Sequence, residues 1–231
     1  SNSSGSIGVG NNYPAYYVSW HMAADFANKV TQQHNTVNGT SLQECYTCED
    51  SGSTSVACTE AVNPYQCNGY VLPTEGEWEY AARSGTINGF WTGQGDYLGG
   101  NVYFVDCNGT EVINDSANTP LLTDYAWYCG NNNPEYGNSD RYGSKEVGQK
   151  LPNGFGLYDM HGNLFELTAD AWGGEYPQSS RDPYSNEDLD TCVIRGGTWV
   201  NNPDWMEASF RNGIDSIDRS YIVGFRLGLH P

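Results

Sequence analysis

The seven cysteines are the residues whose type and spacing carry the most chemistry in this chain. A zinc ribbon needs two close Cys-x2-Cys pairs, and only Cys45 and Cys48 have that spacing. Disulfides that staple an irregular, exported segment are the alternative, and we expect them here. The pairing stays open, because four clustered cysteines allow three connectivities. The candidates for disulfide bonds are Cys45, Cys48, Cys58, Cys67, Cys107 and Cys129.

The composition excludes several classes of protein. Ten Lys and Arg against 28 Asp and Glu give a net charge of −18, which a nucleic-acid backbone would repel. No apolar run approaches the roughly 20 residues that a membrane span needs. An aromatic content of 13% argues against disorder, and few Leu, Glu and Lys argue against a helical bundle. We expect a loop-rich, acidic, secreted globular domain with no nucleic-acid partner and no membrane span.

The N-terminal part of the chain predicts an arm, a strand and a helix. Residues 1–12 are mostly Ser, Asn and Gly, so we expect a flexible arm and no signal peptide there. Residues 14–18 are expected to form a short strand. Ser19 can cap a helix over residues 20–34. The apolar stripe predicted for that helix is Met22, Ala23, Phe26 and Val30.

The remainder predicts few regular elements. Residues 35–69 are expected to be a polar, irregular, cysteine-rich insert. A Thr-x-x-Glu capping box at residues 74–77 opens a helix that ends near residue 83. Residues 86–155 show little periodicity and need disulfides or metal ions to hold them. Core strands are expected within residues 192–199 and 221–229.

Four blocks in a fixed order carry a resemblance to a known family. They are YVSW at 17–20, LPTEGEWEYAAR at 72–83, PNGFGLYDMHGNLFE at 152–166, and RGGTW at 195–199 followed by GFR. The chain resembles the formylglycine-generating enzyme (sulfatase-modifying factor) family over about residues 13–229. The resemblance implies an α+β, C-type-lectin-like fold, loop-rich and calcium-stabilised, with residues 13–231 as a single domain.

The chain departs from the family at its start. The family has further strands and a helix before the Val-Ser-Trp block, and here only about 16 residues precede it. This favours processing from a longer precursor, or a strand that another chain supplies by β-augmentation.

The family's catalytic cysteines have no counterpart in this chain. Those cysteines bind copper as thiolates and oxidise a substrate cysteine, and Cu(I) favours such soft ligands. Residues 196–207 contain no cysteine, and Asn201 stands about where the first would be. An amide cannot replace a thiolate, so we expect a non-catalytic family member.

The resemblance also assigns one or two calcium ions, which take six to eight oxygen ligands each. The alternative for the first site is a turn with exposed acids. The first site is assigned to Asp159, Gly162, Leu164 and Glu166. The second site is assigned to Asn131, Asn132, Asp140 and Tyr142. His161 is expected at the surface or beside the first ion. A non-haem iron site needs two His and one carboxylate, and the sequence does not meet this requirement.

A further set of side chains is expected on the ligand-binding face of the fold. Trp and Tyr frequently anchor interfaces, although large aromatics are more often core residues. The candidates are Thr198, Trp199, Asn201, Trp205, Phe210 and Tyr221.

The hypothesis that follows is a non-catalytic, calcium-stabilised extracellular subunit of a surface assembly or filament. Its partners would be copies of itself or another surface protein. One alternative is an extracellular glycan- or peptide-binding module. The other is a metal-dependent oxidase or protein-modifying enzyme of the same family.

Overall fold

The chain divides into two compact units, each assembled from segments that are distant in sequence. The computed structural model describes residues 8–50, 56–93, 104–105, 107, 111–112, 121–132, 143–173, 176, 182–186 and 189–230. The first unit comprises Ser1–Tyr16, Glu79–Glu166 and Arg195–Arg211. The second unit comprises Tyr17–Trp78, Leu167–Ile194 and Asn212–Pro231.

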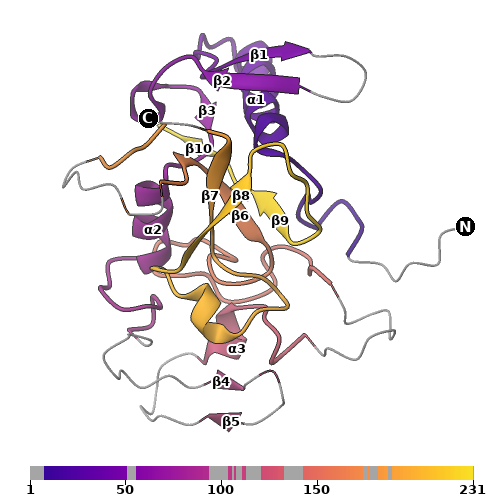
Figure 1. The fold of residues 1–231 in the computed structure, drawn as a ribbon, viewed down its shortest axis with the longest axis vertical. Coiled ribbons are helices and arrows are strands. Elements are labelled where there is room, and N and C mark those ends of the chain that lie inside the picture. Colours follow the sequence, from indigo (N-terminus) through magenta and orange to yellow (C-terminus); the bar gives the residue numbers. More distant parts are fainter. Residues whose placement is uncertain are drawn as a thin grey trace, which may run out of the picture. The chain divides into compact units, whose positions relative to one another are not determined.

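The described residues form a mixed α+β fold of short elements joined by long irregular segments, which confirms the predicted fold class (Figure 1). The helices are α1 (Trp20–Asn38), α2 (Glu75–Arg83) and α3 (Leu122–Tyr125), with 3-10 turns η1 (Pro64–Gln66) and η2 (Pro203–Met206). The strands are β1 (Tyr46–Asp50), β2 (Val56–Glu60), β3 (Tyr70–Val71), β4 (Phe104–Val105), β5 (Glu111–Val112), β6 (Phe165–Ala171), β7 (Thr191–Arg195), β8 (Arg211–Asp215), β9 (Val223–Phe225) and β10 (Gly228–Leu229).

The strands pair into one four-stranded sheet and three two-stranded ones. The larger sheet has the order β8-β7-β6-β9, and β6 and β7 supply its most buried residues. Strands β1 and β2, β3 and β10, and β4 and β5 form the antiparallel pairs. The two predicted core strands are therefore present as β7 and, further along the chain, β9 and β10.

Helix α1 begins at the predicted cap but buries a different face from the predicted stripe. The Ser19 hydroxyl accepts a hydrogen bond from the Met22 amide, at 3.3 Å. Phe26, predicted to be buried, is 49% exposed, and Met22 and Val30 are only half-buried. Small or hydrogen-bonding side chains let neighbouring segments approach α1 more closely than bulky apolar ones do. Tertiary packing therefore buries that face of α1 and not the predicted stripe. The buried residues are Trp20, Ala23, Ala24, Ala27, Asn28 and Thr31.

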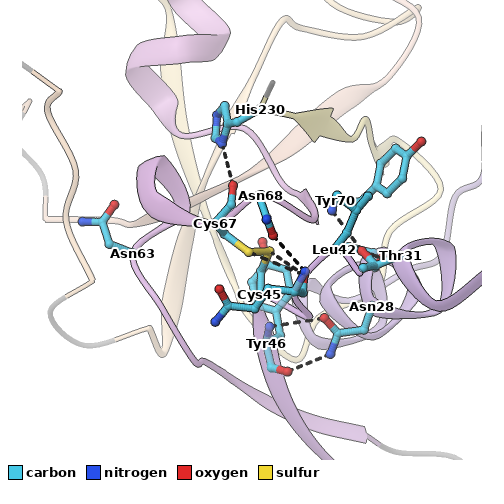
Figure 2. Close-up of a disulfide and its surroundings, with 12 residues drawn as sticks. Asn28, Thr31, Leu42, Cys45, Tyr46, Asn63, Cys67, Asn68, Tyr70 and His230 are labelled. Atoms are coloured by element: carbon cyan, nitrogen blue, oxygen red, sulfur yellow. Dashed lines mark hydrogen bonds between the residues drawn. A yellow bond between two sulfur atoms is a disulfide. The ribbon is translucent and has the colours of Figure 1, made fainter. Parts of the chain in front are cut away.

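The segment 35–69 is not wholly irregular, because β1 and β2 form a hairpin that packs beside α1 (Figure 1). Asn28 of α1 binds this hairpin through both ends of its amide. Its Nδ2 donates to the Tyr46 carbonyl at 2.7 Å, and its Oδ1 accepts from the Tyr46 amide at 3.2 Å (Figure 2). One side chain thus satisfies a buried backbone donor and acceptor at the strand's start.

The strand predicted over residues 14–18 is absent. Tyr17 has a left-handed φ of 57°, which a strand cannot contain, and its amide donates to the Ser220 carbonyl at 3.0 Å. Of the predicted arm, residues 1–7 lie outside the described part of the chain. The Asn12 carbonyl accepts from the Val147 amide at 2.9 Å, so the arm's last residue is held by a hydrogen bond.

The capping box before α2 is confirmed, and a second carboxylate strengthens it. The Thr74 amide donates to Glu77 Oε2 at 2.9 Å, and the Glu77 amide donates to the Thr74 hydroxyl at 3.2 Å. Asp170 of β6, which is buried, accepts from the Glu75 amide at 2.6 Å. A carboxylate at a helix N-terminus is favourable, because unpaired amides and the helix dipole both point toward it.

The C-terminal residues are tied to the cysteine-rich segment. His230 Nε2 lies 2.6 Å from Glu77 Oε1, and its Nδ1 lies 3.1 Å from the Cys67 carbonyl, beside the Cys45–Cys67 disulfide (Figure 2). Burial lowers the pKa of His230, but its hydrogen bonds to Glu77 and Cys67 outweigh burial and hold the pKa above its ordinary value. His230 is therefore held by both Glu77 and the Cys67 carbonyl.

The first unit is organised around a buried cation. Arg195 is fully buried, its guanidinium pairs with Glu79 of α2, and it also donates to the Phe210 carbonyl. Glu79 additionally pairs with Arg83 at 2.7 Å. The cost of burying a guanidinium is offset by matching its charge with a carboxylate in this way.

The second unit contains a buried carboxyl group that lacks such matching. Both carboxyl oxygens of Glu60, at the end of β2, are shielded from solvent, and no described residue hydrogen-bonds to them. Burial, with a smaller contribution from the nearby Asp170 charge, raises the pKa of Glu60 from 4.5 to about 8. Glu60 is therefore protonated in the folded chain at neutral pH, whereas in the unfolded chain it is ionised.

The raised pKa of Glu60 predicts a pH-dependent penalty on folding. A carboxyl with a raised folded-state pKa favours folding below about pH 4.5, and this contribution is lost as the pH rises to about 8. We expect the free energy of unfolding of Glu60→Gln, relative to that of the parent, to rise by on the order of 3 kcal/mol between pH 4.5 and 9. The reason is that the Gln amide cannot ionise. Urea unfolding across this range measures the gain. Glu49→Gln, at an exposed position of the paired strand, serves as the control, and a pH-independent difference for Glu60→Gln would contradict the prediction.

Candidate functional site

Three segments of the first unit meet around Asn163. Trp127 and Gly162 form a parallel bridge, and the Asn163 amide donates to the Trp127 carbonyl at 2.9 Å. The Gly162 amide donates to the Gly196 carbonyl at 2.7 Å, and the Trp199 amide donates to the Asn163 carbonyl at 2.9 Å. Two of the family-like blocks, at 152–166 and 195–199, are thereby joined through their backbones.

Two glycines make this close approach possible. Gly162 has a φ of 81°, and a Cβ on it would lie 2.1 Å from the Trp127 carbonyl oxygen. Gly197 has a φ of 70°, and a Cβ there would lie 2.8 Å from the Trp205 carbonyl oxygen. Any side chain at either position would push two backbone segments apart, in addition to the strain of the left-handed conformation.

Asn163 positions the loop that contains Lys145. The Lys145 amide donates to Asn163 Oδ1 at 3.0 Å, and Asn163 Nδ2 donates to the Lys145 carbonyl at 3.2 Å. Asn163 has a φ of 65°, a conformation that Asn tolerates better than most residues. Its side-chain amide therefore pairs with the backbone of Lys145 as a neighbouring strand would, although neither residue lies in a strand.

One residue predicted for the second calcium site, Asn132, contacts a lysine. The Lys145 ammonium donates to Asn132 Oδ1 and, at 2.6 Å, to the Gly143 carbonyl. Asn132 Nδ2 donates to the same Gly143 carbonyl at 2.9 Å, which fixes the amide's orientation. Asn131 is also engaged, because its Oδ1 accepts from the Tyr128 amide at 3.0 Å.

These contacts do not fit a metal ion at the second site. Asn131 and Asn132 were predicted as calcium ligands, and the side-chain oxygen of each already accepts a hydrogen bond. Asp140 and Tyr142, the other two predicted ligands, lie outside the described residues. The second calcium ion therefore stays a prediction, and the contacts of Asn131 and Asn132 argue against it.

Two cations gather at one aromatic ring. Lys150 Nζ lies 3.9 Å from the centroid of the Trp127 ring and donates to the Thr123 carbonyl, while Lys145 Nζ lies 5.9 Å from the same centroid. Both distances suit cation–π attraction. Burial lowers the pKa of Lys145 to about 8, and burial also lowers the pKa of Lys150.

The residues of the first predicted calcium site lie in the same unit. Asp159 and Glu166 are half-buried, whereas Gly162 and Leu164 are buried. Asp159 Oδ2 accepts from the Gly148 amide at 2.7 Å, so one carboxylate oxygen orders the loop. Within the described part of the chain, no three His, Cys, Asp or Glu side chains form a metal cluster. This calcium assignment stays a prediction.

His161, expected at the surface or beside the first calcium ion, is a core residue. It is buried, its Nδ1 lies 2.7 Å from the Met206 carbonyl, and its ring packs at 5.2 Å from that of Phe90. The hydrophobic cluster around it comprises Phe90, Leu122, Tyr125, Ala126, Tyr128, Cys129 and Met206.

The predicted binding-surface residues fall into different environments. Thr198 and Trp199 are buried, so the surface prediction is wrong for both, because the Gly196–Gly197 turn carries them into the core. Asn201 is half-buried and its Oδ1 accepts from the Thr198 hydroxyl at 2.7 Å. Trp205 is 37% exposed and stacks on Phe210 at 5.0 Å. Tyr221 is 38% exposed and belongs to the second unit.

The cysteine chemistry is that of disulfides. Six of the seven cysteines form the pairs Cys45–Cys67, Cys48–Cys58 and Cys107–Cys129. This confirms the predicted disulfides and excludes the zinc ribbon, whose thiolates they consume. The seventh, Cys192, is buried in β7, and burial raises the pKa of its thiol to about 12. A thiol in that state is unreactive.

Sequence reasoning missed the lysine cluster. The chain contains only three lysines, and two of them, Lys145 and Lys150, lie within six residues of each other and flank the ring of Trp127. The available signal was that lysines are rare in this strongly acidic chain. A cation among many carboxylates is attracted to its surroundings and therefore tends to be held in place.

Comparison with known proteins identifies the family. The sulfatase-modifying factor enzyme 1-like domain matches residues 2–229. The chain belongs to the sulfatase-modifying factor family. Its fold is the loop-rich, C-type-lectin-like fold of that family.

Proteins similar to this family member carry different names. The chain is 28% identical to the chaperone protein LppX of Paenibacillus barcinonensis over 90% of its own length and 66% of that protein. It is 35% identical to the formylglycine-generating enzyme of Mycobacterium tuberculosis over 56% of its own length and 36% of the enzyme. The solved structure of Treponema denticola variable protein 1 superposes with a TM-score of 0.62 and 26% identity, covering 100% of this chain and 77% of that one.

The family member therefore spans less than two thirds of the curated relatives that it matches. Among the described helices, none combines the length and the apolarity that crossing a bilayer requires. The three disulfides fit an exported protein, because disulfides persist outside the cytosol, which keeps thiols reduced.

The Asn163 junction predicts an unusually large effect for one amide. Asn163→Ala removes both hydrogen bonds to Lys145 and keeps a left-handed residue, so we expect a loss of about 2–4 kcal/mol in the free energy of unfolding. Asn163→Gly relieves the backbone strain and should recover about 1 kcal/mol of that loss. Urea denaturation of both variants measures these differences. Asn38→Ala, at the exposed end of α1, is the control, and an Asn163→Ala variant as stable as this control would refute the assigned role.

Proposed function

We propose that this chain is a non-catalytic, extracellular member of the sulfatase-modifying factor family that acts as a structural subunit of a surface assembly. In this proposal the domain supplies contact surface to further copies of itself or to another surface protein. It contributes no active site. The family fold is used as a scaffold whose loops are held by disulfides and internal polar contacts.

The observation that carries the proposal is the state of the seven cysteines. A copper oxidase of the family type needs two thiolates side by side. Three disulfides consume six of the cysteines, and Cys192 is a single buried thiol with a pKa near 12. The described fold therefore offers no thiolate pair, and residues 196–207 supply no cysteine to make one.

The relatives support a role in binding rather than in oxidation. A relative that matches 90% of this chain is named as a chaperone, and a structural neighbour is named as a variable protein. The two formylglycine-generating enzymes match only 56% and 63% of the chain. A contact-making role agrees with the chaperone and the variable protein, which match more of the chain than these enzymes do. The disulfides agree with an extracellular site of action.

A direct assay separates this proposal from the enzymatic alternative. Purified protein is incubated with Cu(I) and a cysteine-containing peptide, and the peptide's mass is followed. We expect no oxidation of the peptide, and thiol titration should detect no reactive group until unfolding exposes Cys192. Sedimentation velocity over a concentration series measures self-association in the same preparation. Conversion of the peptide cysteine to an aldehyde would overturn the non-catalytic proposal.

We also propose one calcium ion at Asp159, Gly162, Leu164 and Glu166, where two half-buried carboxylates flank a buried turn. Calcium at about 100 times its Kd would stabilise the native chain by about 2.7 kcal/mol. We therefore expect a chelator to lower the Tm by about 5–10 °C, and Asp159→Ala or Glu166→Ala to abolish most of that shift.

Differential scanning calorimetry with and without chelator measures this shift. Asp25→Ala is the matched control, because Asp25 pairs with the exposed Lys29 on α1 and should leave the chelator response unchanged. Two variants that respond to chelator as the parent does would show that calcium is not bound by these carboxylates.

A glycan- or peptide-binding module is the second candidate, and one observation favours it. Trp205 presents 37% of its surface to solvent and stacks at 5.0 Å on Phe210, which gives a flat aromatic platform suited to sugar rings or apolar peptide groups. A glycan and peptide array compares the parent with Trp205→Ser and with Tyr80→Ser, an exposed aromatic elsewhere in the same unit. Binding lost only in Trp205→Ser would favour this candidate.

A further inference from the structure

We propose that the ammonium group of Lys145 is an internal cation that takes the place of a second metal ion in this chain. The proposal concerns how the loops of the first unit are held together. It does not depend on whether the domain assembles, binds a glycan or does both.

The ammonium group sits among oxygen acceptors that come from separate segments. It donates to Asn132 Oδ1 and, at 2.6 Å, to the Gly143 carbonyl, and both acceptor residues are buried. Asn132 Nδ2 in turn donates to the Gly143 carbonyl at 2.9 Å and to the Trp199 carbonyl at 3.4 Å. A single cation thus joins the 127–132 segment to the 143–145 segment, which is what a bound ion would do.

The backbone of Lys145 is fixed independently of its side chain. Asn163 holds both its amide and its carbonyl, at 3.0 and 3.2 Å, so the residue cannot swing away easily. The ring of Trp127 lies 5.9 Å from Nζ and gives the charge an electron-rich face. The ammonium is therefore anchored at its backbone, at its side-chain donors and along an aromatic surface.

Calcium and this ammonium cannot share the site. Ca²⁺ needs six to eight oxygens, and the amide oxygens of Asn131 and Asn132 are already engaged by Tyr128 and Lys145. A divalent ion beside a positive charge in a partly buried site would also be strongly repelled. Binding calcium here would require the Lys145 side chain to leave.

Lysine labelling of the wild-type protein tests the proposal directly. The native protein is treated with an amine-reactive reagent, with and without excess Ca²⁺, and the labelling rates at Lys29, Lys145 and Lys150 are read by peptide mass spectrometry. We expect the rate at Lys145 to change less than about twofold on adding Ca²⁺. If Ca²⁺ took the oxygens of Asn132 and Gly143, it would free the amine and raise that rate by about tenfold or more, which would overturn the proposal.

Lys29 is the internal reference in that experiment, because its side chain is 65% exposed and pairs with Asp25 of the same helix. Its labelling rate should be unaffected by Ca²⁺, so any general effect of the ion on the reagent is visible there.

A matched pair of variants gives the second arm. Lys145→Met keeps the length of the side chain and removes the charge, and Lys29→Met makes the same change on the surface. We expect Lys145→Met to lower the Tm by about 4 °C or more, with no recovery on adding Ca²⁺, and Lys29→Met to lower it by about 1 °C at most. A Lys145→Met protein that melts like the parent, or that regains its Tm in Ca²⁺, would overturn the proposal.

Discussion

The described part of the chain contains few paired β-strands, so many of its buried backbone amides and carbonyls need other hydrogen-bond partners. The rest of the structure depends on this constraint. Asparagine side chains do much of this. Asn28 binds the amide and carbonyl of Tyr46, and Asn163 binds those of Lys145. Asn153 accepts from two amides of its own turn and donates to the Ala81 carbonyl at 2.7 Å. A primary amide carries the same donor and acceptor as a peptide, so it can replace a missing strand neighbour.

The same constraint explains why a strongly acidic chain places cations inside. Arg195 is fully buried and contacts Glu79 and the Phe210 carbonyl, and Lys145 contacts Asn132 and Gly143. Each cation offers several donors to carbonyls that the loops leave unpaired. Basic residues are scarce in this sequence, and several of those present bind loop carbonyls instead of covering the surface with charge.

The cysteines show how one fold can serve different chemistry. A family enzyme keeps two thiolates available, whereas this chain uses its cysteines as crosslinks in the hairpin segment and at Cys129 beside the core. Crosslinks within loops restrict the unfolded chain and compensate for the small number of regular elements. Crosslinked loops of this kind suit the contact-making role proposed for the domain.

The sequence by itself determined the family, the α+β class, the capping box at residues 74–77 and the formation of disulfides, because each depends on local chemistry or on blocks in a fixed order. Only the tertiary structure decided the cysteine pairing, the buried face of α1, the burial of Trp199 and the partner of Asn132. Those features depend on which segments meet in space. Cys45 and Cys67, like Asn132 and Lys145, become neighbours only when long loops close, and no local pattern encodes that closure.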